Sequence, residues 1–413
     1  MSSHRVVITG MGAVSAIGND VDSFWGSIKN GTCGIGHITS FDTTYSQVKL
    51  AAEVKGLNSE QYFENRDTKH NARFMLLARI AAQQAYHSSG LDTADFDRDR
   101  FGVYVSSSIG GIEVLEKSKE SFSATAPARV SPYLIPSTLV NLASGAIAID
   151  VQARGSNLPI VTACASGANS IGEAFHKIQL GLEDIILAGA SDAAITPLSL
   201  AGFAAMRAMH TGDNPDRACI PFDSERSGMV MGEGAGILVL EELEHALERK
   251  APILGEIVGY GANCDAFNIV SPDLEGKTIS KAINKAIDDS GVKKTSIKYI
   301  NAHGTATVLN DKTETRAIQN VFGEHAKDVL VSSTKSMTGH TLGASGAIEA
   351  IVCIKALQDN FVPATVNYLK PDPECDLNLV VNKGIAQKLD IVLSNSFGFG
   401  GHNACLIFKK WQA

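Results

Sequence analysis

A cysteine at the junction of a predicted strand and a predicted helix is well suited to covalent chemistry. Cys164 follows the apolar segment 159–163, which we predict to be a buried strand, and precedes a helix with apolar residues at helical spacing up to Leu182. Unpaired amides and the positive end of the helix dipole meet at such a junction, and they would lower the pKa of the thiol. An inert core thiol is the alternative, because free cysteines are often buried. This stretch alone leaves both interpretations open.

Two histidines and a lysine follow predicted strands in the second half of the chain. His303 lies in NAHGT, and Lys335 and His340 lie in SSTKSMTGH. Ligands of α/β proteins collect at the carboxyl ends of strands. A histidine in a core is usually structural, but two of them at strand ends, each near Gly and Thr, favour a functional role.

Two other motifs suggest chemistry that the sequence disfavours. The segment 10–18, GMGAVSAIG, is similar to a dinucleotide-binding loop, but Ser15 stands where that fingerprint needs glycine. The segment 189–193, GASDA, half matches the elbow of serine hydrolases, but its last glycine is missing and Pro197 follows closely. We therefore expect neither a nucleotide site nor a nucleophilic serine.

The composition limits the class of protein further. The 413 residues are 44% hydrophobic and 19% charged, which is ordinary for a globular chain, and the formal charge of -8 is spread without blocks. Nucleic-acid binding is therefore not the main task, and an acidic partner needs a local basic patch. Seven cysteines without a CxxC pair argue against disulfides and zinc. With no signal sequence and no membrane-length apolar run, we expect a cytoplasmic protein.

The elements that must position these residues alternate between strands and helices. Strands are expected at 6–9, 101–106, 159–163, 184–190, 237–241, 253–260, 297–301, 329–333, 391–395 and 404–408. Helices are expected at 20–29, 73–89, 139–151, 168–182, 242–250, 277–290, 312–322 and 347–358. Residues 127–136 are expected to form a proline-punctuated loop.

The two halves of the chain repeat one pattern. A strand, a Ser/Thr-rich junction and an Ala/Gly-rich helix occur at 159–182 and again at 329–358. The sequence therefore predicts an α/β protein with a duplicated unit, in which two sheets are sandwiched between helix layers. We divide it into an N-terminal half, 1–251, with the cysteine, and a C-terminal half, 252–413, with the histidines and the lysine.

Four separated motifs together resemble one enzyme family. TACASG at Cys164, NAHGT at His303, SSTKSMTGH and NSFGFGGHN occur in the order found in the 3-oxoacyl-acyl-carrier-protein synthases, most closely the synthase II group of type II fatty acid synthesis. The resemblance extends over essentially the whole chain. It implies an acyltransferase with the thiolase fold, two similar halves in a five-layered αβαβα sandwich, and a homodimer.

The resemblance also implies a mechanism. Cys164 takes an acyl group from the phosphopantetheine arm of an acyl carrier protein, and malonyl-carrier protein then loses carbon dioxide to give the carbanion that attacks this acyl-enzyme. His303 and His340 donate hydrogen bonds to the malonyl thioester oxygen, Lys335 supports them, and the backbone amides of Cys164 and Phe399 form an oxyanion hole. No cofactor or catalytic metal on this chain is implied.

Further residues receive roles only through the resemblance. Phe399 is the expected gate over the cysteine, in a loop that glycines allow to move. The acyl tunnel and the pantetheine arm are expected to contact Ile109, Phe203, Thr305, Thr307, Gly400 and, from the second subunit, Ile135. Carrier-protein docking is expected at Arg66, Lys69, Arg129 and Arg207. A buried monovalent cation is expected at Asn301, Glu349, Ser394 and Asn395.

The chain departs from the family pattern in places, and rival functions exist. Val308 and Asn310 replace the Pro and Gly of HGTSTPxGD, and the basic stretch near residue 65 is thinned to Arg66 and Lys69. A polyketide-type ketosynthase of the same fold is the alternative function. A non-catalytic chain-length partner is disfavoured because such proteins lack the cysteine, and a thiolase because it uses a second catalytic cysteine rather than two histidines.

Overall fold

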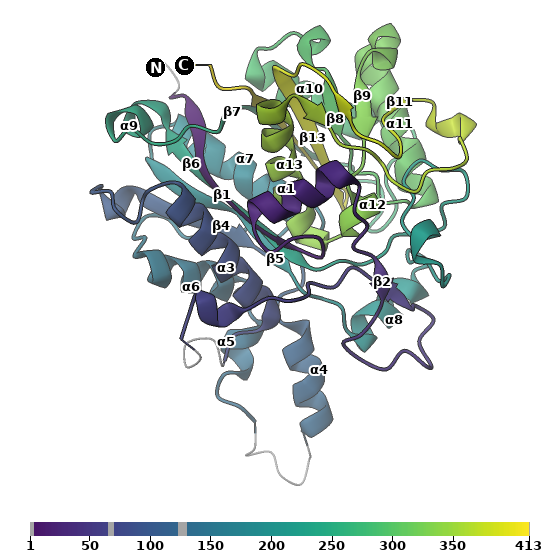
Figure 1. Ribbon diagram of the computed structural model, residues 1–413, viewed down its shortest axis with the longest axis horizontal. Helices are drawn as coiled ribbons and strands as arrows, with labels where there is room; N and C mark the ends of the chain where they lie inside the picture. The colour runs from purple at the N-terminus through teal and green to yellow at the C-terminus, as the bar shows by residue number, and fades with distance from the viewer. Residues whose placement is uncertain (1–3, 65–69, 123–129, 413) are drawn as a thin grey trace.

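The computed structural model describes residues 4–64, 70–122 and 130–412, and a mixed sheet of ten strands forms its centre (Figure 1). The strand order is β11-β9-β8-β13-β14-β7-β1-β6-β5-β4. The strands are β1 (Val6–Ser15), β4 (Phe101–Ser106), β5 (Ile185–Asp192), β6 (Gly234–Glu242), β7 (Gly255–Cys264), β8 (Tyr299–Asn301), β9 (Leu330–Ser332), β11 (Asn378–Leu379), β13 (Ile391–Gly398) and β14 (His402–Lys409). Two short pairs lie outside it: β2 (Gly36–His37) with β3 (Leu50–Ala51), and β10 (Phe361–Val362) with β12 (Ile385–Ala386).

The sheet consists of two arrays with the same topology. In the second half, β9, β8 and β13 run parallel, and β14 and β7 follow antiparallel. In the first half, Asn157 forms a parallel bridge to β4, β4 is parallel to β5, and β6 and β1 follow antiparallel. The arrays meet where β1 and β7 pair over three positions. This repeat confirms the predicted duplication.

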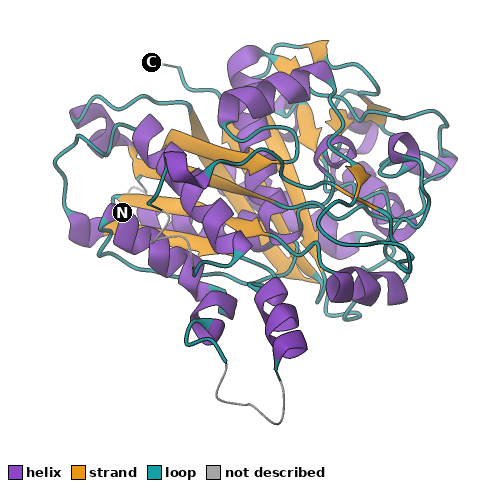
Figure 2. Ribbon diagram, turned by 60° about the horizontal axis from the view of Figure 1, so that its bottom comes forward, coloured by secondary structure: helices purple, strands orange, loops and turns teal. Residues whose placement is uncertain are grey.

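Helices separate and cover the two arrays. The principal ones are α1 (Val21–Asn30), α3 (Arg73–Ser88), α4 (Ile112–Ser121), α5 (Leu134–Thr138), α6 (Asn141–Val151), α7 (Ser166–Gln179), α8 (Pro197–Ala205), α9 (Leu243–Glu248), α10 (Lys277–Ser290), α11 (Val308–Phe322), α12 (Lys335–Thr338) and α13 (Ser345–Asp359). Helices α7 and α13 pack against each other and against strands of both arrays. Helices α3 and α6 cover the first array, and α10 and α11 cover the second; Figure 2 shows helices packed on both sides of the strands. The predicted five-layered αβαβα sandwich is confirmed.

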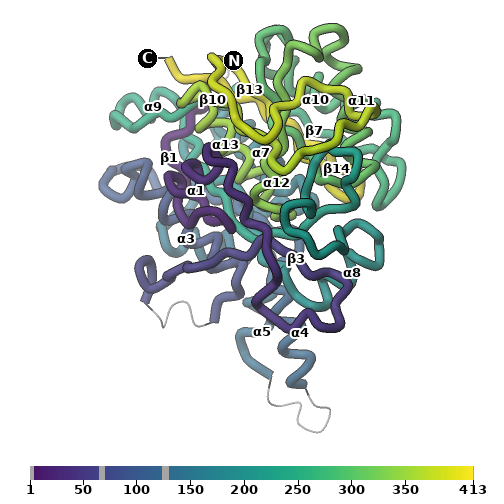
Figure 3. Tube along the Cα trace, turned by 45° about the vertical axis from the view of Figure 1, so that its right-hand side comes forward, coloured from purple at the N-terminus to yellow at the C-terminus, as the bar shows by residue number. Residues whose placement is uncertain are grey.

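The two central helices bury most of their residues, ten of fourteen in α7 and twelve of fifteen in α13, as expected of helices packed between sheets. Their glycines permit close approach where the site forms: a Cβ on Gly167 would lie 2.8 Å from the carbonyl oxygen of Gly343. Figure 3 shows the early helix α1 over the late helix α13, where the Trp25 indole donates to Asp359 at 2.7 Å. The first helix of the chain therefore packs on the C-terminal end of a central helix.

The GMGAVS segment is strand rather than loop. All ten residues of β1 are buried, and a Cβ on Gly12 would lie 1.9 Å from the carbonyl oxygen of Ala81 in α3. The glycines therefore serve strand-to-helix packing, and the strand continues to Ser15, where the sequence predicted that it ends at residue 9.

Two sequence-based predictions of local structure are wrong. The segment 159–163 is not a strand, since only neighbouring Asn157 bridges to Val103, and Leu158 and Val161 are each 49% exposed. It lies at the edge of the sheet and Pro159 lacks an amide, so a regular ladder does not form. The predicted proline loop contains the helix α5, and the helices α4 and α8 were not predicted.

Candidate active site

Cys164 lies in a tight turn immediately before α7. Ala163 takes a left-handed conformation with φ of 50°, and the Ser166 hydroxyl accepts from the Thr162 amide and donates to the Ala163 carbonyl. The side chain of Cys164 thus lies at the helix N-terminus, as predicted, although a turn and not a strand presents it. This turn is a strained backbone site of the kind that holds nucleophiles.

Burial dominates the electrostatics of the thiol. Cys164 is only 8% exposed, and burial raises the pKa of its thiol to about 12, against the opposing influence of Lys335. The predicted lowering of this pKa is therefore wrong for the free protein. The backbone amides of Cys164 and Phe399 both act on the sulfur in the lowering direction, which places two N–H groups beside it. Two convergent amides are what an oxyanion hole requires.

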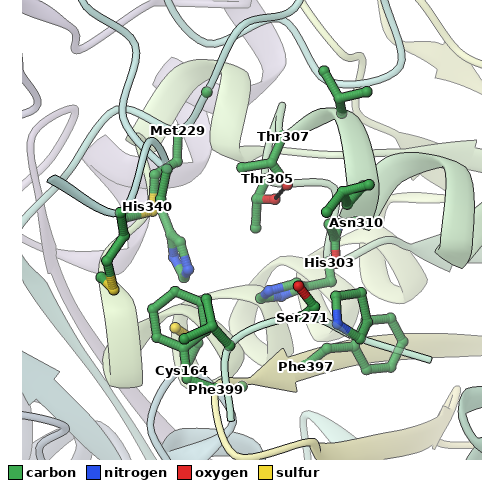
Figure 4. A pocket seen from close by; sticks show the side chains of 18 of the residues that line it. Cys164, Met229, Ser271, His303, Thr305, Thr307, Asn310, His340, Phe397 and Phe399 are labelled. Atoms are coloured by element: carbon green, nitrogen blue, oxygen red, sulfur yellow. Dashed lines mark hydrogen bonds between the residues drawn. The ribbon is translucent and has the colours of Figure 1, made fainter. Parts of the chain in front are cut away.

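A cavity of about 290 Å³ opens above the thiol. Figure 4 shows Cys164 and the rings of His303 and His340 facing this space, and Thr305 and Thr307 on its far wall. The predicted residues that line it are Cys164, Phe203, Arg207, His303, Thr305, Thr307, His340 and Phe399. Residues from both halves of the chain therefore meet in one chamber.

His303 is held from two sides. Glu314 accepts its backbone N–H at 2.9 Å, and Lys335 Nζ lies 3.4 Å from its ring Nδ1. An ammonium can only donate, so this contact makes Nδ1 an acceptor and leaves the proton on Nε2. Burial, with Lys335 and His340 adding to it, holds the pKa of His303 well below its ordinary value, and the ring is neutral.

His340 is neutral for the same reason and has the same tautomer. Burial and the Lys335 charge hold its pKa well below the ordinary value. The Leu342 N–H donates to His340 Nδ1 at 3.2 Å, and the Ser345 hydroxyl lies 2.9 Å from the same nitrogen. Because Nδ1 accepts, Nε2 carries the proton. Both imidazoles are thus hydrogen-bond donors, with ring centroids 5.3 Å apart.

Lys335 is a buried cation with a buried partner. Its side chain is 1% exposed and forms an ion pair with Glu349. Burial raises the pKa of Glu349 to about 7 although Lys335 opposes this. The position explains how one lysine reaches His303 directly and disfavours protonation of both imidazoles.

The turn that carries Phe399 is tied to the neighbouring loop. It joins β13 to β14, and Gly400 and Gly401 have φ of 86° and 76°, values that favour glycine. The Gly400 amide donates to the carbonyl of Ile269 at 2.8 Å, and the rings of Phe399 and Phe203 stack at 6.2 Å. Phe399 therefore lines the cavity beside Cys164 (Figure 4), and its role as a gate stays a prediction.

Only some of the residues predicted to hold the acyl chain lie close to Cys164. Ile109 and Phe203 pack in the same apolar cluster as Cys164, beneath the cavity. Ile135 is 61% exposed on α5 and lies away from the cavity lining of its own chain. Ile135 was predicted to line the acyl tunnel of a second subunit, so its role stays a prediction.

Of the polar residues predicted to contact the pantetheine arm and the carrier protein, only some lie at the cavity within the described part of the chain. The hydroxyls of Thr305 and Thr307 are 2.9 Å apart on the cavity wall, and Arg207 is exposed at its mouth. Arg66, Lys69 and Arg129 lie outside the described residues.

The predicted cation site consists of buried oxygen atoms that have no hydrogen-bond partner in the structure. These are Asn301 Oδ1, Glu349 Oε2, Ser394 Oγ and Asn395 Oδ1. Asn301 and Ser394 are neighbours in register on β8 and β13. Unsatisfied buried oxygens call for a counterpart, and an all-oxygen set suits a hard cation. The four residues therefore fit the predicted ion.

Two buried carboxylates of the site were not predicted. Glu314 accepts from the amides of His303 and Gly304, and burial raises its pKa to about 7. Asp192, at the end of β5, accepts from the loop at Ile109 and from Gly343. The spacing of Glu314, eleven residues after His303 on an expected helix, was a usable signal, whereas nothing local marks Asp192.

Comparison with known proteins identifies the family. The model of the beta-ketoacyl synthase N-terminal domain matches residues 3–246, and that of the C-terminal domain matches 254–369. A 3-oxoacyl-[acyl-carrier-protein] synthase 2 of Synechocystis sp. is 47% identical over 413 residues, covering 100% of this chain and 99% of the relative. Its namesake from Staphylococcus aureus (strain N315) is 48% identical over 411 residues, 99% of each chain. The chain belongs to the beta-ketoacyl synthase family, and its acyltransferase class is that of this family.

Solved structures agree. A beta-ketoacyl synthase from Burkholderia phymatum is 33% identical with a TM-score of 0.91, over 99% of this chain and 100% of that one. The ishigamide ketosynthase/chain length factor is 35% identical with a TM-score of 0.92 and the same coverage. A type II PKS acyl-carrier protein in complex with its ketosynthase gives a TM-score of 0.91 at 32% identity, again over 99% and 100% of the two chains. The resemblance stated from the motifs is confirmed.

Proposed function

We propose that the protein elongates fatty acyl chains by two carbons, through decarboxylative condensation of malonyl-acyl carrier protein with an acyl group on Cys164. The observation that carries this proposal is one chamber that holds a thiol beside two backbone amides and two neutral imidazoles with Nε2–H groups. The amides suit a tetrahedral oxyanion, and the imidazoles suit an enolate oxygen.

The first half-reaction transfers the acyl group. The Cys164 sulfur attacks the thioester carbonyl, and the amides of Cys164 and Phe399 stabilise the oxyanion that forms. The carbon–sulfur bond to the pantetheine arm then breaks. Because the free thiol is protonated, its proton leaves as the sulfur attacks, and the departing pantetheine thiolate takes up a proton.

The second half-reaction makes and uses the carbanion. The malonyl carboxylate leaves as carbon dioxide, and its electron pair forms an enolate whose oxygen accepts hydrogen bonds from His303 and His340. The enolate carbon attacks the acyl carbonyl on Cys164, the thiolate leaves, and a 3-oxoacyl thioester departs on the arm. Burial, with the Lys335 charge adding to it, keeps both imidazoles neutral, so they donate without transferring a proton.

The carrier protein is the proposed partner, and it delivers both substrates. The chain itself supplies no cofactor, because the reactive thioester arrives on the partner's arm. Thr305 and Thr307 are placed to hydrogen-bond that arm. At the mouth of the cavity, Arg207 can contact acidic side chains of the partner. Exposed apolar side chains there can contact its apolar surface; they are Met206, Val270, Val308 and Leu309.

A second copy of the chain is the proposed structural partner. Exposed apolar side chains form two small groups: Leu158 and Val161 at the free edge of the first array, and Ile135 and Leu139 on and directly after α5. Such clusters mark interaction surfaces. A homodimer would cover them and bring Ile135 toward the second cavity. Light scattering at working concentrations should give twice the 43.6 kDa chain mass, and a monomer would refute the dimer.

We place the reaction in the cytoplasm. All seven cysteines are free thiols, which suits a reducing compartment. Among the described residues, no helix combines the length and apolar character needed to cross a membrane.

An elongation assay with a ladder of acyl-carrier proteins, read by mass spectrometry, tests the function. We expect 3-oxoacyl products two carbons longer than each accepted primer, and Ile109→Phe should shorten the longest primer accepted. A wild-type protein that forms no condensation product with any primer would refute the proposal. The polyketide-type alternative, favoured by the neighbours that carry polyketide names, predicts repeated extension of one primer without reduction.

A further inference from the structure

Asp192 is a fully buried carboxylate beside the catalytic chamber. It ends β5 and is 0% exposed. Five donors converge on its two oxygens: the hydroxyls of Ser107 and Ser108 at 2.5 and 2.8 Å, and the amides of Ser108, Ile109 and Gly343 at 3.1, 3.4 and 2.7 Å. A carboxylate has four lone-pair sites and no proton to donate, so it alone among side chains of this size can accept from so many donors.

The five donors come from two loops that are far apart in sequence. Ser107, Ser108 and Ile109 follow β4 in the first half, and Ile109 packs in the apolar cluster that contains Cys164. Gly343 belongs to the second half and directly follows Leu342, whose amide donates to His340 Nδ1. Asp192 therefore joins the loop beneath the acyl site to the turn that orients a histidine.

The turn between His340 and Gly343 needs such an anchor. Leu342 has a φ of 52°, a left-handed conformation that is costly for a leucine. A Cβ on Gly343 would lie 2.8 Å from Asp192 Oδ2, so the backbone meets the carboxylate at close range. Releasing Gly343 would allow the turn to relax, and the Leu342 amide would then leave His340 Nδ1.

We propose that Asp192 is a positioning residue that, by anchoring the Gly343 amide, fixes His340 as an Nε2–H donor. The inference rests on the proposed function, since it assigns Asp192 to the malonyl half-reaction through His340. Asparagine cannot replace it, because its amide group would face amide donors with a donor of its own.

The test separates the two half-reactions in Asp192→Asn. Malonyl decarboxylation should fall about 10- to 100-fold, because an oxyanion donor is misplaced rather than removed. Acylation of Cys164, followed by intact mass, should stay within about threefold of the wild type. Glu241→Gln is the matched control: Glu241 is also 0% exposed and bonded to Thr9, His245 and Arg249. It should lower the melting temperature and leave the ratio of the two half-reactions unchanged.

A second measurement can be made even if Asp192→Asn does not fold. In wild-type protein labelled with ¹⁵N-histidine, the His340 resonance, assigned by its loss in His340→Gln, should show an unprotonated Nδ1 at neutral pH. In a folded Asp192→Asn variant this signature should weaken. A protonated Nδ1 in the wild type would overturn the proposal.

The remaining outcomes are also decisive. Equal losses in both half-reactions, or a change in their ratio in Glu241→Gln, would mean that Asp192 serves stability alone. An unchanged decarboxylation rate in Asp192→Asn would remove its link to His340. If His340→Ala itself decarboxylates normally, the proposed function of the histidine fails and not the role of Asp192 in the turn.

Discussion

The corresponding loops of the two duplicated halves carry different chemistry. In the first half, the segment beside β4 leads through a tight turn to Cys164 at the start of α7. In the second, β9 beside β8 leads to Lys335 and His340 before α13. In the proposed mechanism, one repeat therefore supplies the nucleophile, and the other supplies the groups that stabilise a negative oxygen. Duplication places the two sets face to face because α7 and α13 pack together in the central layer.

The halves also differ at their outer edges. In the second half, β11 pairs with β9 and covers that side of the array. In the first half the equivalent position beyond Asn157 has no further strand among the described residues, and Leu158 and Val161 are exposed. An open apolar edge is a site for association. The half that carries Cys164 is thus also the half with the proposed dimer surface.

The largest expected effect concerns the nucleophile loop. Cys164→Ala should abolish acyl-enzyme formation and condensation, because no other described residue lining the cavity is a thiol. Cys164→Gln should keep malonyl decarboxylation, since the histidine loops are intact. Intact mass after incubation with acyl-carrier protein measures the first, and carbon dioxide release the second. Cys219→Ala, at another buried thiol, is the control; an acyl mass gain in Cys164→Ala would contradict the assignment.

Substitutions in the histidine loops should impair decarboxylation and spare acylation. His303→Ala and His340→Ala should each lower malonyl decarboxylation about 100- to 1000-fold, the usual cost of one oxyanion donor, while Cys164 is still acylated. His325→Ala, at a histidine paired with Asp328 outside the cavity lining, should change neither step. If His303→Ala released carbon dioxide at the wild-type rate, the assignment of decarboxylation to the second half would be wrong.

The two halves should also differ in their response to pH. With a thiol pKa of about 12, alkylation of Cys164 should rise about tenfold per pH unit from about pH 7 to 10 without levelling. Decarboxylation by Cys164→Gln should not fall through protonation of an imidazole between about pH 8 and 6, because both imidazole pKa values lie well below the ordinary one; a change in this range would report Glu314 and Glu349, whose pKa values burial raises to about 7. A plateau of alkylation near pH 7 would instead support a helix-lowered thiol pKa.

The smallest effect concerns the cavity mouth. Arg207→Glu should raise the Michaelis constant for acyl-carrier protein a few-fold at low salt, and spare a small pantetheine thioester, because exposed charges are screened. Lys250→Glu is a close control, since both residues are exposed and left-handed, with φ of 56° and 57°. Equal damage with both substrates would place the fault in the cavity rather than in docking.

Much of the fold could be predicted from local patterns. The helix 277–290 and the strand 101–106 match α10 and β4 in the structure, because strong apolar periodicity survives in any tertiary context. The segment 159–163 failed because its apolar residues face an open edge and not a core. The helix α8 was not predicted because its apolar and small residues do not alternate with polar residues at helical spacing.

The sequence by itself determined which residue types carry the chemistry, since the motifs around Cys164, His303, Lys335 and His340 each place one reactive side chain after a strand or turn. Only the tertiary structure decided their protonation. Burial raises the thiol pKa against the influence of Lys335, burial and Lys335 together keep the imidazoles neutral, and the contacts of Lys335 and the Leu342 amide with the Nδ1 atoms set the Nε2–H tautomers. Asp192 and Gly343 are 151 positions apart, so no local pattern could join them. Periodicity and propensity are local properties, whereas burial and hydrogen bonding depend on which distant segments the fold brings together.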